Sequence, residues 1–447
     1  MAYNALETDR FLDEFTKRHP HMPEFHQAMA DVAEDVIPHI NARRNENEAR
    51  ILRYLSSPDR VISFRVTWQD DDNRMRFNQG FRVQYSNAMG VYKGGLRFHP
   101  GVDASVLHFL AFEQTLKNSL TGLPMGGAKG GADFDPKGRS DAEIRRFCQA
   151  FMTQLARHIG PDIDVPAGDI GVGIREIAWM FDQYRTVTGH FSGVLTGKHP
   201  TFGGSCFREE ATGYGCVYLA QEVMKKRGDG LEGKSCTLSG AGNVALHTAR
   251  KLIDCDAKVI TLSDSDGFVR FPEGIGRETL EQIADHKAQR GRLEALAGEE
   301  GWEFHSGEKP WSVPADLAFP CATQNELKES DARCLVENGC DAVFEAANMP
   351  CTSAASRVLR EAEVILVPSK AVNAGGVAVS GMEISQNRMR LRWPVERVDE
   401  ELRKVMTDIH EACLEFGEDS RGVDYKRGAN IAGFSRLAQV IDYYGVS

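Results

Sequence analysis

The sequence predicts an α/β protein of two domains, and three observations carry that prediction. The chain of 447 residues exceeds what one hydrophobic core usually accommodates. Between about 212 and 375, short apolar runs alternate with helical stretches, the order typical of a parallel sheet flanked by helices. A polar, glycine-rich stretch around Gly203-Gly204-Ser205 offers a hinge between the domains.

The N-terminal part combines helices with strands of a different period. Apolar side chains recur at helical spacing through residues 6–58, and we expect surface helices there. Apolar and polar residues alternate through 60–86 on both sides of a turn at Asp70-Asp71-Asp72-Asn73, which predicts a β-hairpin. A short strand entering a tight turn is predicted over 162–171, and a long amphipathic helix over about 398–413.

Composition excludes several classes of function. The 53 basic and 64 acidic side chains give a net charge of −11, which argues against nucleic-acid binding and against an anionic membrane surface. No apolar run approaches the roughly 20 residues that span a bilayer, and the N-terminus does not resemble a signal peptide. The ten cysteines lack metal-ligand spacing, so we expect reduced thiols, a cytoplasmic enzyme and no metal site.

A glycine signature predicts a dinucleotide site. A credible buried strand at 235–239 runs directly into Gly240-Ala241-Gly242-Asn243-Val244-Ala245. A helix over 244–253 and a strand over 258–262 follow, and that strand ends in Ser263-Asp264-Ser265-Asp266. The glycine pattern alone would indicate only a strand-to-helix turn. The complete order of strand, turn, helix, strand and acidic residue favours a dinucleotide-binding site.

Each small residue of the signature has a physical role. Gly240 permits the tight turn, Gly242 lets backbone N–H groups approach the pyrophosphate, and the helix N-terminus faces its charge. Asp264 follows Gly240 by 24 residues, close to the roughly 20 expected of an acid that binds the ribose. Asp264 and Asp266 would repel a 2′-phosphate and favour NAD, whereas Lys287 and Arg290 could neutralise one, although such residues usually line a solvated helix face.

Three lysines, Lys93, Lys117 and Lys129, lie among glycines and apolar residues between positions 92 and 131. Lysine is rarely buried unless paired, and in an apolar frame an ammonium can clamp an anion or lose its proton easily. Two carboxylate clamps and one amine of low pKa would suit a small dicarboxylate. Taken separately, each lysine could be an ordinary surface charge, and Asp169 could be only a turn former.

Together these residues fit one chemistry beside a nicotinamide cofactor. Hydride removal from a carbon that bears an amine yields a C=N group, which then needs water addition and proton transfer. A lysine of lowered pKa beside an aspartate, here Lys129 and Asp169, can do both. His99, His108 and Cys321 receive no role, because a structural histidine or a buried thiol is the commoner case.

The chain resembles the small microbial glutamate dehydrogenases of the Glu/Leu/Phe/Val dehydrogenase family. The resemblance runs through essentially the whole chain and rests on seven motifs in order. They are Tyr92-Lys93-Gly94-Gly95-Leu96-Arg97-Phe98, Leu123-Pro124-Met125-Gly126-Gly127-Ala128-Lys129-Gly130-Gly131, Asp164-Val165-Pro166-Ala167-Gly168-Asp169, Glu210-Ala211-Thr212-Gly213-Tyr214-Gly215, Cys321-Ala322-Thr323-Gln324-Asn325, Ala346-Ala347-Asn348-Met349-Pro350 and Asn373-Ala374-Gly375-Gly376-Val377.

The resemblance implies a fold and a reaction. A substrate and oligomerisation domain would comprise residues 1–203, completed by a C-terminal helix at about 425–447. A Rossmann-type domain with a connecting helix would comprise 204–424, with the catalytic cleft between the two domains. The implied enzyme is a homohexamer that converts L-glutamate reversibly to 2-oxoglutarate and ammonia.

The resemblance also implies roles for single residues. Lys129 would be the catalytic lysine and Asp169 its proton-transfer partner. The remaining substrate-binding residues would be Gln114 and Lys117 at the α-carboxylate, Lys93 and Ser380 at the distal carboxylate, and Gly168, Thr196 and Val377 lining the pocket. The cofactor-binding residues would be Thr212, Gly240, Gly242, Asn243, Val244, Asp264 and Asn348.

Cofactor choice and two rival functions stay open at this point. Asp266 resembles NAD-using relatives, but Ser263-Asp264-Ser265 with Lys287 and Arg290 resembles NADP users, and we favour NADP over NAD. A leucine, phenylalanine or valine dehydrogenase would carry an apolar side chain in place of Lys93. A catalytically silent dinucleotide-binding subunit would have lost Lys129 or Asp169, and both are present.

Overall fold

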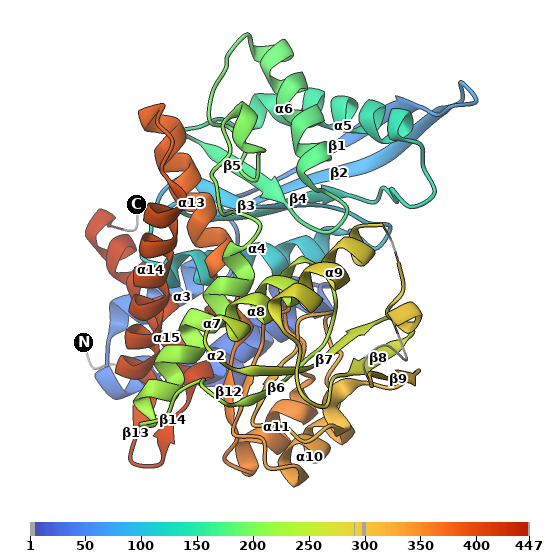
Figure 1. Ribbon diagram of the computed structural model, residues 1–447. Coiled ribbons are helices and arrows are strands. Elements are labelled where there is room, and N and C mark those ends of the chain that lie inside the picture. Colours follow the sequence, from blue (N-terminus) through green and yellow to red (C-terminus); the bar gives the residue numbers. More distant parts are fainter. Residues whose placement is uncertain (1–4, 290, 297–300, 446–447) are drawn as a thin grey trace. The chain divides into compact units, whose positions relative to one another are not determined.

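The computed structural model describes residues 5–289, 291–296 and 301–445, which form two compact units (Figure 1). The first unit comprises the residues up to Cys206, Ala378–Val398 and the residues from Asn430 onward; the second comprises Phe207–Val377 and Asp399–Ala429. The sequence-based boundaries kept 204–424 together, whereas Ala378–Val398 groups with the first unit. The reason lies in its contacts, since Gln386 Nε2 donates to Ser205 Oγ at 2.8 Å.

The first unit begins with helices α1 (Thr8–Arg18), α2 (Pro23–Arg43) and α3 (Glu46–Tyr54), which confirms the helical start. Phe15 of α1 and Phe25 of α2 pack edge to face, with ring centroids 4.9 Å apart. Helix α15 (Tyr425–Tyr444) joins this unit from Asn430 onward. It is tied to α4 (Ala104–Leu120), because Ser119 Oγ donates to the carbonyl of Gly433 at 2.8 Å.

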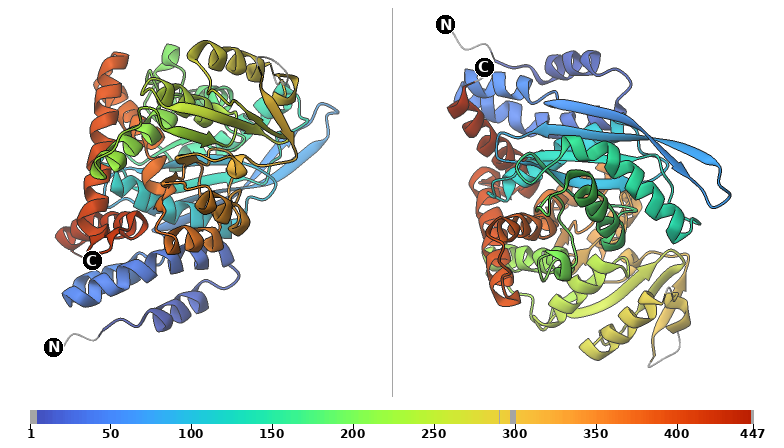
Figure 2. Two further views of the ribbon diagram at one scale, coloured as in Figure 1. Left: turned by 60° about the horizontal axis from the view of Figure 1, so that its bottom comes forward. Right: turned by 90° about the horizontal axis from the view of Figure 1, so that it is seen from above.

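A mixed sheet of five strands forms the centre of the first unit, in the order β1-β2-β4-β3-β5. Strands β1 (Arg60–Gln69) and β2 (Met75–Ser86) pair antiparallel, as the alternating pattern predicted. Strand β3 (Tyr92–Phe98) lies between β4 (Gly127–Ala132) and β5 (Asp164–Gly168) and is parallel to both. The β1–β2 turn projects beyond the rest of this sheet (Figure 2).

The two faces of this sheet are covered differently. Helices α5 (Asp141–Leu155) and α6 (Ile174–Thr188) cover one face, and α4 lies on the other (Figure 1). Leu96 and Phe98 of β3 enter the apolar core beneath α5 and α6. Because successive side chains of a strand point to opposite faces, Lys93, Gly95 and Arg97 face the α4 side. Lys93 and Arg97 therefore lie on the face of the sheet opposite the apolar core beneath α5 and α6.

The second unit contains a seven-stranded sheet in the order β12-β11-β10-β6-β7-β8-β9. Its parallel part contains β6 (Ser235–Leu238), β7 (Lys258–Asp264), β10 (Leu317–Phe319), β11 (Ala342–Phe344) and β12 (Ile365–Val367). Strands β8 (Gly267–Arg270) and β9 (Glu303–Ser306) are antiparallel, so the sheet departs at this edge from the parallel pairing that the alternating pattern predicted. Only Ser265 and Asp266 join β7 to β8, and a parallel return needs a far longer crossover.

This part of the chain also forms helices, and the last two of them have residues in both units. In order, the helices are α7 (Ala211–Lys226), α8 (Asn243–Ile253), α9 (Arg277–Ala288), α10 (Glu329–Glu337), α11 (Ser353–Glu361), α12 (Ser369–Val372), α13 (Gly375–Met389) and α14 (Val395–Gly417), followed by the small hairpin β13 (Glu418–Asp419) and β14 (Gly422–Val423). Among the described residues, no helix has the length and apolar character required to cross a bilayer.

Candidate active site

Lys129 and Asp169 lie together in the first unit. Lys129 projects from the middle of β4, and its Nζ is 3.1 Å from Oδ2 of Asp169, which follows the end of β5. A third residue joins them, because Arg97 Nε donates to the same Asp169 Oδ2 at 2.7 Å. One carboxylate oxygen therefore accepts from two cations, and all three side chains are largely buried.

The glycine between Lys93 and Arg97 makes this cluster sterically feasible. A Cβ on Gly95 would lie 2.8 Å from Asp169 Cβ and 3.3 Å from Lys129 Nζ, too close for both side chains to stay in place. Residues 93, 95 and 97 share one face of β3, so the absent side chain leaves room where the acid and amine meet. The sequence predicted the glycine frame, and the structure assigns it this steric role.

The electrostatics favour a lysine that loses its proton easily. Burial lowers the pKa of the Lys129 ammonium; Asp169 opposes this effect, while the guanidinium groups of Arg97 and Arg82 add to it. Burial raises the pKa of the Asp169 carboxyl, but Lys129 and Arg97 outweigh burial and hold that pKa below its ordinary value. Asp169 is thus a stable carboxylate beside an amine of reduced basicity.

Asn118 links the three elements that carry the lysines. From α4, its Nδ2 donates to the carbonyl of Lys93 at 3.0 Å and to that of Gly126 at 2.6 Å. Its Oδ1 accepts from Gln114 Nε2 at 2.7 Å, so the predicted substrate ligand Gln114 is already oriented. Lys117, one residue before Asn118, is half-buried on the same helix, and Lys93 is only 1% exposed.

A buried ion pair supports the sheet from its other face. Arg82 on β2 donates through Nε to Asp164 Oδ2 at 2.9 Å and through Nη1 to the Gly94 carbonyl at 3.2 Å. Both partners of the pair have side chains that are 0% exposed. A Cβ on Gly130 would lie 2.9 Å from Arg82 Cδ, so this glycine lets the arginine cross β4. The pair fixes the strand that carries Lys93 and Arg97.

Two other first-unit residues that the sequence predicts for the substrate site, Thr196 and Ser380, lie on two further segments. Thr196 is fully buried; its N–H donates to the Pro166 carbonyl at 3.0 Å, and its hydroxyl has no hydrogen-bond partner among the described residues. Ser380 lies on α13 next to Gly381, where a Cβ would approach Met125 Sδ to 2.9 Å. That helix is therefore packed against the segment that leads into β4.

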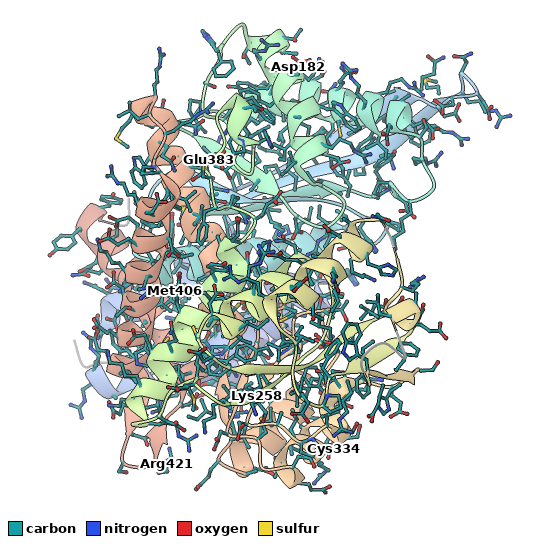
Figure 3. All side chains as sticks on the ribbon, viewed as in Figure 1. Asp182, Lys258, Cys334, Glu383, Met406 and Arg421 are labelled. Atoms are coloured by element: carbon teal, nitrogen blue, oxygen red, sulfur yellow. The ribbon has the colours of Figure 1, made fainter. Side chains whose placement is uncertain are left out.

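A second buried ion pair ties those two segments together. Lys198 Nζ lies 2.7 Å from Glu383 Oε1, and Gly197 N–H donates to Glu383 Oε2 at 2.9 Å. Glu383 projects from α13, one turn after Ser380 (Figure 3). Val377 precedes Ser380 on this helix but falls in the second unit, and Gly168 ends β5 immediately before Asp169.

In the second unit, the predicted dinucleotide turn has the required geometry. Gly240 has φ +83°, a conformation that favours glycine, and its N–H donates to Ser263 Oγ at 2.8 Å. Gly242 precedes α8, and a Cβ placed on it would meet nothing within 4 Å. Packing does not require a glycine there. The open space and the free helix N-terminus fit the approach of a pyrophosphate.

The carboxylates at and just after the end of β7, Asp264 and Asp266, form ion pairs with basic side chains. Asp264 Oδ2 accepts from Lys287 Nζ and from the Leu293 N–H, each at 3.0 Å. Burial raises the Asp264 pKa, but these hydrogen bonds prevail and hold it below its ordinary value. Arg292 lies 3.2 Å from Asp266 and also donates to Ser265 Oγ. Arg290, the other predicted cation, lies outside the described residues.

The other predicted cofactor residues belong to loops and helix starts of the same unit. Thr212 is near the start of α7, and a Cβ placed on Gly376 would lie 2.5 Å from its Oγ1. Asn348 is exposed, and its Oδ1 accepts from Asn373 Nδ2 at 2.9 Å. Asn243 begins α8 and donates to the Glu209 carbonyl at 2.8 Å, with Val244 beside it.

Sequence reasoning missed several residues that hold the site together. Arg97, Asn118 and Asn373 lie inside or beside the quoted motifs but received no role, because a motif does not show which side chains face one another. Arg82 and Arg292 had no signal beyond being arginines. Cys321, which received no role, is buried, and burial raises the pKa of its thiol well above the ordinary value. Among the described residues, no group of His, Cys, Asp or Glu could hold a metal ion.

Comparisons with known proteins agree with this arrangement. Residues 203–445 match the model of the Glutamate/Leucine/Phenylalanine/Valine dehydrogenase family, and residues 58–186 match its Glu/Leu/Phe/Val dehydrogenase dimerisation domain. An NADP-specific glutamate dehydrogenase of Salmonella typhimurium is 50% identical over 98% of each chain. An NAD-specific glutamate dehydrogenase of Clostridium symbiosum is 49% identical over 98% of this chain and 99% of its own.

A solved structure gives the same picture at the level of the fold. The crystal structure of Plasmodium falciparum glutamate dehydrogenase superimposes with a TM-score of 0.95 at 47% identity, covering 98% of this chain and 95% of the other. The chain belongs to the Glu/Leu/Phe/Val dehydrogenase family.

Proposed function

We propose that this chain is an NAD(P)-dependent glutamate dehydrogenase in which Lys129 and Asp169 transfer the protons. The reaction converts L-glutamate, water and oxidised cofactor to 2-oxoglutarate, ammonium, reduced cofactor and a proton, and it is reversible. The observation that carries the proposal is the 3.1 Å contact between Lys129 Nζ and Asp169 Oδ2 on the face that also carries Lys93. Relatives that are about half identical over the whole chain bear the name glutamate dehydrogenase.

The side chains of this protein suit the proton steps. When bound, a nicotinamide dinucleotide accepts the hydride from the α-carbon of glutamate. Neutral Lys129 then takes a proton from the water that attacks the resulting imine carbon and returns a proton to the departing nitrogen. Asp169 remains a carboxylate that stabilises the lysine each time it becomes charged. Burial of both groups excludes bulk water from these steps.

Substrate choice would rest on the residues at the two carboxylates. Lys117 and Gln114 would hold the α-carboxylate, while Lys93 and Ser380 would hold the distal one, with Gly168, Thr196 and Val377 lining the pocket. Lys93 is 1% exposed and lies on the same face of β3 as Gly95 and Arg97, next to the Lys129–Asp169 pair, and this position supports the role. An enzyme for leucine, phenylalanine or valine would not need a cation there, and it is the less favoured alternative.

For the cofactor, we favour NADP over NAD. Lys287 and Arg292 bring two cations to the end of β7, where a 2′-phosphate would extend from the ribose. The test is kcat/KM for NADPH and NADH at one pH, in the wild type and in Lys287→Gln. We expect the variant to lose at least tenfold with NADPH and less than twofold with NADH. Equal losses would remove this preference.

A matched control distinguishes a local from a general charge effect. Lys258 begins β7, the strand that Asp264 ends, and its side chain is exposed (Figure 3). Lys258→Gln removes the same charge and should leave both kcat/KM values within twofold of the wild type.

The assembly would be a homohexamer in the cytoplasm. The matched dimerisation domain contains the β1–β2 hairpin, where Met75 is 75% and Phe77 73% exposed, so a partner could cover apolar surface there. All ten cysteines are free thiols, which suits a reducing compartment. Light scattering after size-exclusion chromatography would give the mass; a monomer of 49.5 kDa would contradict the assembly.

A direct assay tests the function. Purified protein is mixed with 2-oxoglutarate, ammonium and either reduced cofactor, and absorbance is followed. We expect turnover with at least one cofactor in the wild type and a loss of at least a thousandfold in Lys129→Ala, because the proton acceptor disappears. No turnover by the wild type with either cofactor would overturn the function; retained activity in the variant would overturn the role of Lys129.

A further inference from the structure

We propose that Arg97 is a positioning residue that shares the Asp169 carboxylate with Lys129 and thereby keeps the lysine from being locked as an ammonium ion. The inference rests on the proposed function of the Lys129–Asp169 pair and adds a third member to it. The basis is the geometry at one atom, Asp169 Oδ2, which accepts from Arg97 Nε at 2.7 Å and lies 3.1 Å from Lys129 Nζ.

The two cations are not equivalent partners. Arginine remains protonated at every pH at which the protein is folded, whereas a buried lysine can become neutral. Arg97 makes the shorter contact, so it satisfies the carboxylate whether or not Lys129 carries a proton. When Lys129 is neutral, Asp169 therefore does not become an unpaired buried charge, a state that would be strongly unfavourable.

Without Arg97 the pair would behave differently. Asp169 would have Lys129 as its remaining cation, and the buried carboxylate would favour the ammonium form of that lysine. Arg97 also repels the Lys129 ammonium, and both effects act in the same direction. Burial lowers the pKa of the Lys129 ammonium and the nearby Arg97 and Arg82 guanidinium groups lower it further, which is the direction that this mechanism requires.

The fold places Arg97 for this purpose. Lys93, Gly95 and Arg97 occupy alternate positions of β3 and hence one face of the sheet. β3 and β5 are parallel, with Leu96 opposite Gly168, so Arg97 lies opposite Asp169 at the next position. Arg97 thus reaches Asp169 from the side, while the missing side chain of Gly95 leaves room for Lys129.

The other charged groups around Lys129 do not substitute for Arg97. Arg82 of β2 acts from the opposite face of the sheet, where it is paired with Asp164. Lys93 of β3 and Lys117 of α4 belong to the predicted substrate ligands, and α4 also carries Glu113 and His108. Among the described residues, Asp169 forms ion pairs with Lys129 and Arg97, and of these two cations only Arg97 stays charged at every pH at which the protein is folded.

The test compares Arg97→Gln and Arg97→Lys with the wild type. Glutamine keeps a donor without charge, and lysine keeps a charge with one donor group. The reactivity of Lys129 is measured without turnover, as the rate of its acetylation by acetic anhydride between pH 6 and 10, followed by peptide mass spectrometry. Only the neutral amine reacts, so the midpoint reports its titration. We expect the midpoint to rise by about one pH unit in Arg97→Gln and by clearly less in Arg97→Lys.

Steady-state kinetics gives the second readout. In Arg97→Gln, the acidic limb of kcat for glutamate oxidation should move to higher pH by the same amount, giving roughly a tenfold loss at neutral pH and little loss at pH 9 to 10. Arg76→Met is the matched control, because it removes another arginine–aspartate contact of the same sheet, 2.8 Å from Asp70. Arg76→Met should change neither the acetylation midpoint of Lys129 nor the acidic limb of the pH profile of kcat.

Three outcomes would overturn the inference: an unchanged acetylation midpoint in Arg97→Gln, an activity loss of equal size at every pH, or an equal shift in Arg97→Lys and Arg97→Gln. Acetylation does not depend on the reaction catalysed. A wild type that fails to oxidise glutamate would therefore refute the proposed function and leave the test of Arg97 intact. If Arg97→Gln does not fold, Arg97→Met takes its place with the same expectations, and an unchanged acetylation midpoint in that variant counts against the role.

Discussion

Gly95→Ala should disable the enzyme while leaving the protein folded. A Cβ at this position would lie 2.8 Å from Asp169 Cβ and 2.9 Å from the Gly168 carbonyl oxygen. Carbon atoms in contact prefer at least about 3.5 Å, so Asp169 must retreat by roughly 0.7 Å. Since Lys129 Nζ is already 3.1 Å from Asp169 Oδ2, that retreat weakens or breaks their hydrogen bond.

The expected magnitude follows from the displacement. A shift of about 1 Å in a catalytic group costs on the order of a hundredfold in rate, so we expect kcat/KM for glutamate to fall 30- to 100-fold, about 2 to 2.7 kcal/mol. Overpacking should also lower the stability of the first unit by about 1 to 3 kcal/mol, seen as a lower melting temperature. Steady-state assays and thermal unfolding measure the two effects separately.

A matched glycine substitution serves as the control. Gly160 lies in the same unit without a positive φ, and the nearest atom to a Cβ placed there is Tyr184 Oη at 3.8 Å. Gly160→Ala should therefore keep kcat/KM within twofold. If Gly95→Ala retained more than half of the wild-type kcat/KM, the steric role of Gly95 would be refuted.

Three further changes test other parts of the structure. Lys93→Leu should lower kcat/KM for glutamate by about 10- to 100-fold but that for norvaline far less, and equal losses would refute its role at the distal carboxylate. Arg82→Met should destabilise the first unit by about 3 to 5 kcal/mol, because it leaves the buried Asp164 without its cation. The double variant with Asp164→Asn should recover part of the melting temperature, and failure to do so would contradict the pairing. Gly242→Ala should leave the melting temperature unchanged, since nothing lies within 4 Å of the added Cβ. It should weaken cofactor binding at least tenfold, as measured by fluorescence titration, and unchanged binding would refute the proposal that the pyrophosphate binds at this turn.

Local sequence patterns were sufficient for most elements of the fold. Alternating apolar residues over 60–86 predicted the β1–β2 hairpin, and the glycine signature predicted β6, the turn and α8 in order. These features depend on neighbours in the chain, so their periodicity or conformation is visible in the letters themselves. The antiparallel β8–β9 edge was not foreseen, because β8 and β9 have four residues each, too few for a pattern that shows the direction of pairing.

The residues of the candidate site show the same difference between local patterns and contacts across the fold. The amino-acid sequence shows which residue types are available: lysines framed by glycine, an aspartate at a strand end, and a glycine turn before a helix. The folded chain is needed to show that Arg97 and Lys129 share one oxygen of Asp169, and that Asn118 holds the Lys93 strand. Such contacts join residues up to 72 positions apart, and their distances follow from strand order and register rather than from any local pattern.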